Sequence, residues 1–361
     1  MIELRNGINS YIFKDKKILI TPELNKVKVD LEFELPQNPE QLTKKTVKRF
    51  KKRGILVDSK INEFEPIYDD KTLLKKITFK NIDNKNIDSI FEDFLRNSSI
   101  TPVITIDSSI QSTARLLELI NKKYNENSIN PIVKVFIRND MNEILDVLKN
   151  YLGGRESIEL NNLFLIFYNT IINEEIIEKF KNEINPMEIY IYFQEMDDIN
   201  EIEKSYEKYK LPILLEIGEF MNNLDLNLFK EYPIITNDDS INRLLTAFRL
   251  KTYMSNEILR GKVFLPYCEG CKNRLLIYGD GKVYSCNTGY RAGDCIGNLQ
   301  DMDIKRVLNS EKLKNNRDKI IENSKKYQKT SCLMNFYSGC LYGTFVNKFE
   351  FMDNLLKKLI E

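Results

Sequence analysis

Residues 268–286 read CEGCKNRLLIYGDGKVYSC and hold three of the six cysteines of the chain. The apolar residues on both sides of Gly281 predict two short strands joined by a tight turn, because glycine tolerates the positive φ that such turns need. The predicted strands span residues 275–278 and 282–285. Pairing of these strands would bring Cys271 and Cys286 together at the open end of the hairpin. Cys268 precedes Cys271 by three positions, a separation with which one short loop offers two thiolates to one metal.

The distribution of cysteine and histidine narrows the chemistry of this segment. The six cysteines are Cys268, Cys271, Cys286, Cys295, Cys332 and Cys340, and the first 267 residues contain none. Thiols confined to one segment favour a metal or cluster site over a disulfide framework. The chain has no histidine, which excludes mixed Cys/His zinc sites and nucleophiles activated by histidine. Any metal must therefore be held by cysteine or carboxylate side chains.

Length and charge limit the classes of protein that fit. With 361 residues, the chain is long enough for two or three domains. Its 54 Lys and Arg residues nearly balance its 53 Asp and Glu residues, which argues against a general nucleic-acid or anionic-membrane binder. The N-terminus lacks a secretory apolar core, and no apolar run approaches the roughly 18 residues of a membrane span. We expect a soluble, cytoplasmic protein.

The middle of the chain alternates apolar, β-branched runs with amphipathic stretches. The six runs span residues 103–106, 132–137, 163–167, 188–193, 213–217 and 232–235. Near-continuous apolar strands between amphipathic helices predict a parallel sheet covered by helices. A six-stranded partial (β/α)6 barrel and an open doubly wound sheet both satisfy this pattern. No G-x-G-x-x-G or P-loop motif follows any of these runs.

The first 80 residues have a different character. Residues 11–21 predict a hairpin, and residues 42–58 predict a helix ended by Gly54 and followed by a strand, which together suggest a winged-helix-like module over residues 1–80. Basic side chains crowd the predicted helix: Lys44, Lys45, Lys48, Arg49, Lys51, Lys52 and Arg53. They could form a solvated helix face or an electropositive groove that docks an acidic peptide or nucleic acid. Residues 81–99 then read as a polar linker with a short helix.

The cysteine segment resembles the SPASM domain, the C-terminal extension of radical S-adenosylmethionine enzymes that modify peptides and proteins. The resemblance lies in the C-x9-G-x4-C spacing, in IGNL at 296–299 and in CLMNFYSGC at 332–340. It implies a partial barrel over residues 100–260, a SPASM-like domain over residues 261–345, and a C-terminal helix over residues 346–361. In that family the cysteines bind auxiliary four-iron four-sulfur clusters.

One departure from the family concerns the cluster that cleaves S-adenosylmethionine. Family members carry C-x3-C-x2-C after the first strand, whereas the run at 103–106 is followed by DSSIQST at 107–113. Hydroxyls and amides are poor ligands for a soft iron-sulfur centre. The family's glycine-rich acidic stretch after the second strand is also missing, and RNDMNE stands at 138–143. We therefore expect no S-adenosylmethionine binding and no independent radical chemistry.

The same combination occurs in the SPASM proteins of grasp-with-spasm clusters, which this chain resembles in length and layout. The resemblance implies an accessory protein or maturase for a ribosomally made peptide, acting with an ATP-grasp ligase and binding the precursor peptide. The N-terminal module would then recognise the leader peptide, with Lys44, Lys45, Lys48, Arg49 and Lys52 as the binding residues.

The ligand set is only partly defined by the resemblance. It implies Cys268, Cys271, Cys286 and Cys340 for a first cluster. A second cluster would need four more ligands, but only Cys295 and Cys332 remain, and Asn335 stands where the C-x2-C partner of Cys332 would be. Cys332 is therefore an alternative ligand of the first cluster, and Cys295 is a buried thiol. One cluster is expected and two are possible. Four thiolates also suit structural zinc, so a zinc-stabilised, non-catalytic interaction protein is the alternative. Three carboxylates near expected strand ends, Asp107, Glu216 and Glu219, are candidates for catalytic roles.

Overall fold

A computed structural model describes most of the chain. The described residues are 2–4, 8–13, 16–21, 26–36, 39–58, 64–65, 74–82, 86–126, 129–138, 141–153, 162–194, 199–216, 225–236, 241–242, 244–245, 263–264, 274–327 and 348–360. Four of the six cysteines, Cys268, Cys271, Cys332 and Cys340, lie outside them, as does Glu219.

A ten-stranded sheet organises the molecule, in the order β13-β12-β11-β10-β9-β8-β7-β15-β16-β17. Its strands are β7 (Leu74–Lys80), β8 (Ser98–Asp107), β9 (Ile132–Ile137), β10 (Leu163–Tyr168), β11 (Glu188–Phe193), β12 (Ile213–Leu215), β13 (Ile234–Thr236), β15 (Arg274–Tyr278), β16 (Lys282–Tyr284) and β17 (Gly297–Asn298). Strands β7 to β13 run parallel in chain order. The expected parallel sheet is confirmed, and all six predicted runs contribute a strand to it.

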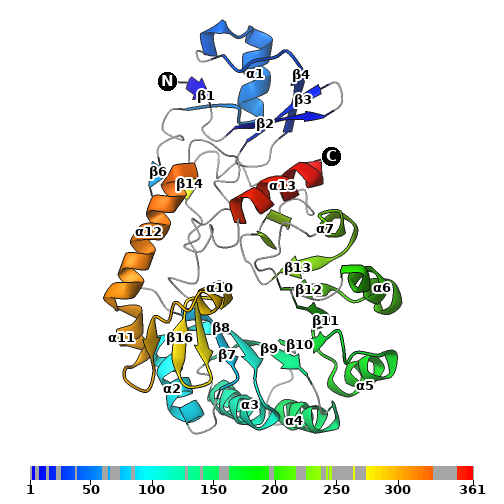
Figure 1. Ribbon diagram of the computed structural model, residues 1–361, viewed down its shortest axis with the longest axis vertical. Coiled ribbons are helices and arrows are strands. Elements are labelled where there is room, and N and C mark those ends of the chain that lie inside the picture. The colour runs from blue at the N-terminus through cyan, green and yellow to red at the C-terminus, as the bar shows by residue number, and fades with distance from the viewer. Residues whose placement is uncertain are drawn as a thin grey trace.

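Helices connect successive strands and cover the outer face of the sheet (Figure 1). They are α2 (Ile87–Asn97), α3 (Ile110–Asn125), α4 (Met141–Gly153), α5 (Glu174–Ile184), α6 (Ile199–Tyr209) and α7 (Leu228–Glu231). Their apolar stripes bury against alternate strand residues, as with Ile77, Ile104 and Val133, each 0% exposed. The other strand residues face inward; they are polar in β7 and mostly aromatic or apolar in β9 to β11. The C-terminal ends of strands β7 to β12 lie on the same side of the sheet, and we call this side the carboxyl edge.

The start of the parallel sheet differs from the sequence expectation. The first parallel strand is β7, so the run at 103–106 belongs to the second strand. The short helix expected within residues 81–99 is present as α2, and its Ile87, Phe91 and Phe94 are buried in the main core, so this helix is part of the fold and not of a polar linker. Lysines and Thr78 alternate with Ile77 and Phe79 in β7, so only one face of this strand is apolar. A search for continuous apolar runs therefore does not find this strand.

Because β7 is the first parallel strand, the loop that follows the first strand is the one after β7 and not the one after β8. The loop after the first strand reads NIDNKN at 81–86, whereas DSSIQST at 107–113 follows the second strand. The corrected loop also contains no cysteine. Neither of the two loops therefore offers a thiol.

The N-terminal part forms a small unit with its own apolar cluster. Strands β2 (Asn9–Phe13), β3 (Lys16–Ile20) and β4 (Lys26–Asp30) make an antiparallel sheet, and β1 (Ile2–Leu4) pairs with β5 (Leu56–Asp58). The hairpin expected at 11–21 is present. Helix α1 (Lys44–Lys52) is capped by Thr43. It is followed by Gly54 at φ +71°, which ends the helix as the sequence predicts. Phe50 of α1 packs with Leu19 and Ile55.

The cysteine-rich hairpin extends the main sheet instead of forming a separate layer. Strand β15 pairs parallel with β7, and β16 pairs antiparallel with β15 across Gly281, whose φ is +85°. Helices α10 (Asn287–Arg291), α11 (Ile304–Leu308) and α12 (Glu311–Tyr327) follow. Gly297 of β17 is needed for close packing, since a Cβ there would lie 2.8 Å from Val307 Cγ2. The hairpin predicted from the glycine-centred stretch is confirmed.

The C-terminal helix α13 (Lys348–Ile360) joins the N-terminal unit to the main sheet (Figure 1). The Tyr11 hydroxyl of β2 donates to Asp353 Oδ1 at 2.7 Å, and Phe351 packs edge-on against Phe229 of α7 with ring centroids 6.1 Å apart. Strands β6 (Phe64–Glu65) and β14 (Val263–Phe264) add a short parallel pair. Among the described residues, no helix is both long enough and apolar enough to cross a membrane.

Candidate functional site

An ion pair with a buried carboxylate and a half-exposed arginine lies at the carboxyl edge, between two neighbouring strands. Asp107 ends β8 and is 5% exposed, and Arg138 directly follows β9. Arg138 Nε donates to Asp107 Oδ1 at 2.8 Å, and its Nη2 lies 2.6 Å from the same oxygen. The guanidinium carbon is 5.2 Å from the ring centroid of Tyr168, within cation–π range. One edge and one face of Arg138 are thus fixed, which aligns its remaining donors.

A second buried carboxylate joins the carboxyl edge to the cysteine-rich segment. Glu216 follows β12, and its Oε2 accepts a hydrogen bond of 2.5 Å from the Tyr192 hydroxyl. Arg291 of α10 places Nη2 3.0 Å from Glu216 Oε1. Burial and then the Glu216 carboxylate raise the pKa of Tyr192, so its hydroxyl stays a neutral donor at physiological pH. Both carboxylates that the sequence singled out and that the structure describes therefore lie at this edge.

Aromatic rings line the inner face beside these pairs. Tyr192 packs edge-on against Phe136 and Tyr168, with centroid separations of 5.1 and 4.9 Å. Burial is the main cause that raises the pKa of Tyr168 to about 12. On the hairpin side, Tyr278 stacks on Tyr290 with centroids 4.5 Å apart. The edge therefore combines fixed charges with flat apolar surfaces.

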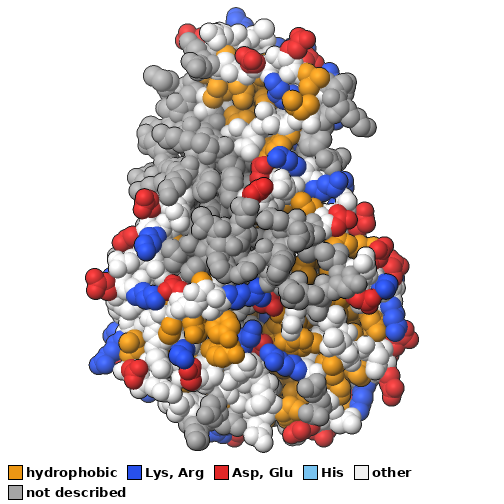
Figure 2. Space-filling model, in the orientation of Figure 1, with side chains coloured by type: hydrophobic (Ala, Val, Ile, Leu, Met, Phe, Trp, Pro, Cys, Tyr) orange, Lys and Arg blue, Asp and Glu red, His pale blue; other side chains and the backbone are white. Residues whose placement is uncertain are grey.

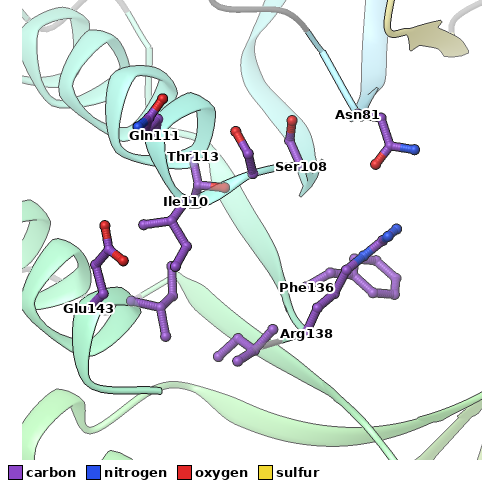
Figure 3. Close-up of a pocket in the computed structure, with 11 residues that line it drawn as sticks. Asn81, Ser108, Ile110, Gln111, Thr113, Phe136, Arg138 and Glu143 are labelled. Atoms are coloured by element: carbon purple, nitrogen blue, oxygen red, sulfur yellow. The ribbon is translucent and has the colours of Figure 1, made fainter. Parts of the chain in front are cut away.

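Two cavities open at the carboxyl edge, and Arg138 lines both. The larger, about 560 Å³, lies between the ends of β7 to β9 and the first turns of α3 and α4 (Figure 3). Hydroxyl and amide groups dominate its polar lining: Asn81, Ser108, Ser109, Gln111 and Thr113. The smaller, about 240 Å³, is lined by Lys80, Arg138, Tyr168, Tyr192, Gln194, Glu216, Asn287, Tyr290 and Arg291.

The two described cysteines have different surroundings, which tests their fit to a metal centre. Cys286 caps the N-terminus of α10, and its Sγ accepts the Gly289 N–H at 3.3 Å. Such an amide-to-sulfur contact stabilises a thiolate, the form in which cysteine binds metal. Cys295 instead directs its thiol toward the Gly297 carbonyl at 3.1 Å, which suits a protonated side chain. Cys286 fits a ligand role, and Cys295 fits the role of a half-buried thiol.

No group of three or more potential metal ligands is brought together within the described part of the chain. The other four cysteines expected to bind the cluster fall outside that part, and their ligand roles stay predictions. Cys286 lies two positions after β16, at the open end of the hairpin where the sequence places it.

The basic side chains of α1 are solvent-exposed. Lys44, Lys45, Lys48, Arg49 and Lys52 all lie on the surface. Arg49 Nη2 donates to the Lys28 carbonyl at 2.9 Å, and no described carboxylate pairs with any of the five. On the face shown in Figure 2, basic and acidic side chains are interspersed. The set is exposed and positively charged, as a docking surface requires, and its peptide-binding role remains a prediction.

Several residues of the site were not foreseen from the sequence. Lys80, Arg138, Tyr192 and Arg291 were not singled out as functional, although Arg138 directly follows a predicted strand. A charged residue at that position of a parallel strand faces the edge where such sheets collect ligands. Arg291 had no comparable signal, because its place depends on how the hairpin docks.

Comparisons with known proteins bear on the cysteine-rich segment. Residues 268–336 match the family model of SPASM, an iron-sulfur cluster-binding domain, which confirms the resemblance drawn from the cysteine and glycine spacing. The structure is similar to that of SuiB from Streptococcus suis, at 12% identity and TM-score 0.48 over 96% of both chains. A structure of SuiB bound to its precursor peptide SuiA matches at 12% identity and TM-score 0.48 over 97% of both chains.

A further similar structure is anSMEcpe with bound AdoMet and Cp18Cys peptide, at 15% identity and TM-score 0.47. That match covers 79% of this chain and 97% of the other. Comparison with curated protein sequences gives no match.

Proposed function

We propose that the protein acts in the maturation of a ribosomally synthesised peptide, as an accessory protein or maturase that binds the precursor peptide. The match of residues 268–336 to an iron-sulfur cluster-binding domain carries this proposal, because that domain resembles the C-terminal extension of peptide-modifying enzymes. The proposed partner is an ATP-grasp ligase, which would supply the bond-forming step. This chain lacks the C-x3-C-x2-C thiols with which family members start radical chemistry.

The proposed cofactor is one four-iron four-sulfur cluster. When bound, such a cluster supplies electron transfer or a rigid link between chain segments. Cys286 would hold it through a sulfur already oriented by the Gly289 amide, together with Cys268, Cys271 and either Cys340 or Cys332. The proposal assigns Cys295 no ligand role, in keeping with its contact to the Gly297 carbonyl.

The carboxyl edge supports peptide binding by its composition. Its inner face offers the rings of Phe136, Tyr168 and Tyr192 beside two fixed arginine–carboxylate pairs. Aromatic rings with a few oriented polar groups are the usual lining of binding sites. We propose that the core segment of the peptide lies here, while the leader segment contacts the basic face of α1.

The test combines metal analysis with peptide titration. Full-length protein purified and reconstituted without oxygen should contain about four iron and four sulfide ions per chain, with visible absorption. It should also bind a synthetic copy of the short peptide encoded beside its gene, measured by fluorescence anisotropy. Zinc at about one ion per chain without iron would instead identify the zinc-stabilised alternative. If the protein binds no peptide that is encoded beside its gene, the proposal is contradicted.

A further inference from the structure

The smaller cavity at the carboxyl edge has an unusual convergence of positive charge. Lys80 ends β7, Arg138 follows β9 and Arg291 ends α10, so three cations from separate elements line one space of about 240 Å³. Lys80 and Arg138 lie near enough to Tyr278 to contribute to its lowered pKa, after the larger effects of its hydrogen bonds with Tyr290 and Asn81.

The described carboxylates of the site are fewer than these cations. Asp107 Oδ1 is taken by Arg138, and the two oxygens of Glu216 are taken by Tyr192 and Arg291. Lys80 makes no ion pair with any residue that the structure describes. Among the residues that the structure describes, three cations against two carboxylates leave one positive charge at a cavity that is partly withdrawn from water. Such a charge attracts an anion more strongly than it would at an open surface.

We propose that this cavity binds a carboxylate group of the precursor peptide, either the side chain of an aspartate or glutamate or the C-terminal carboxylate. This inference rests on the proposed function and specifies the chemistry of the peptide segment that enters the carboxyl edge. One carboxylate neutralises the remaining charge, whereas a phosphate dianion exceeds it. The volume is below the roughly 300–1,000 Å³ of typical small-molecule pockets, so it suits a single side chain.

Neighbouring groups fit the rest of an acidic residue. The rings of Tyr168, Tyr192 and Tyr290 can pack against its methylene groups. The larger cavity adjoins at Arg138 and is lined by the Asn81 and Gln111 amides. Amides there can bond to the peptide backbone on either side of the acidic residue.

The inference can be tested with capped amino acids, which need neither the precursor nor a partner enzyme. Full-length protein is titrated with N-acetyl-glutamate N′-methylamide, its glutamine counterpart and N-acetyl-glutamine free acid, observed by saturation-transfer NMR. We expect at least one of the two acids to bind, and the neutral glutamine probe to bind at least tenfold more weakly. The glutamate amide tests a side-chain carboxylate, and the glutamine free acid tests a terminal carboxylate. Equal binding of the neutral probe would overturn the inference. Displacement of the acids by equimolar inorganic phosphate would also overturn it, as this would identify a phosphate site.

Variants of one strand localise the effect. Lys80→Met should weaken binding of the acidic probes about tenfold, the loss typical of a charge-assisted hydrogen bond, and Lys80→Arg should restore most of it. Lys75→Met, on the same strand and exposed, is the matched control and should bind as wild type does. Equal affinities of the two methionine variants would refute the assignment. Acidic probes that bind while the precursor does not would refute only the proposed function; the opposite pattern would refute only this inference.

Discussion

Arg291 Nη2 lies 3.0 Å from Glu216 Oε1, and this contact joins the helix that follows Cys286 to the end of strand β12. The pair is largely shielded, with side-chain exposures of 29% and 9%. Because Tyr192 holds the other Glu216 oxygen, the contact fixes α10 over the inner face of the sheet. The cysteine-rich segment and the carboxyl edge therefore share one polar network.

Removing the charge of Glu216 should loosen this network. Glu216→Gln keeps an acceptor for Tyr192 but loses the attraction to Arg291, and we expect a fall of about 1–3 kcal/mol in the free energy of unfolding. Urea unfolding of the metal-free protein measures it. Lys204→Gln breaks an ion pair with Glu201 whose side chains are 70% and 48% exposed, and it should cost less than about 0.5 kcal/mol. Equal effects of the two variants would contradict the structural role of Glu216.

The two described cysteines should differ in their effect on metal content. Cys286→Ser removes a sulfur oriented as a ligand, so reconstituted protein should lose most of its iron and its visible absorption. Cys295→Ser should retain both, because the thiol of Cys295 already contacts the Gly297 carbonyl. Iron and sulfide analysis of both variants, prepared side by side without oxygen, decides the matter. Loss of iron in Cys295→Ser would give that residue a ligand role.

Stability should fall at alkaline pH because of Tyr168. Its pKa is raised to about 12 in the folded protein, against about 10 in an unfolded chain. The stabilising contribution is complete below pH 10 and is lost as the pH rises toward 12, since the unfolded state releases the proton first. The free energy of unfolding is measured with urea at several pH values between 10 and 12. It should fall less steeply with pH in Tyr168→Phe than in wild type, by up to about 1 kcal/mol per pH unit. Identical slopes would count against the burial of this hydroxyl.

The basic face of α1 should contribute to binding of the precursor peptide. Lys45→Glu with Lys48→Glu should weaken binding about tenfold at low ionic strength, and the difference should shrink in high salt because exposed charges are screened. Lys314→Glu with Lys319→Glu on α12 makes the same charge change at two exposed positions and serves as the control. Anisotropy titrations at two salt concentrations compare them. If both pairs weaken binding equally, the effect is one of net charge and not of this face.

The parallel sheet could be predicted from the sequence because its strands are apolar on both sides. The runs at 132–137 and 188–193 coincide with β9 and β11. Strand β7 could not, since Lys76, Thr78 and Lys80 alternate with its buried residues. Those polar residues belong to the inner face, so the same feature that hid the strand contributes to the site.

The site itself was only partly predictable. Asp107 and Glu216 could be placed at strand ends, and Cys286 at the open end of the hairpin, because local spacing determines these positions. The pairing of Glu216 with Arg291 depends on the parallel docking of β15 against β7. No local pattern in the sequence encodes a contact between segments so far apart.

The pairing of β15 with β7 also has a consequence for synthesis of the protein. Asn81, just after β7, bonds to Tyr278 at a sequence separation of 197 residues. Until the ribosome has made the hairpin, β7 has an unsatisfied edge, a surface prone to association with other chains. Completion of the sheet is thus a late event of slow, non-local folding. For the same reason, removal of the cysteine-rich segment would expose the edge of β7 that β15 covers.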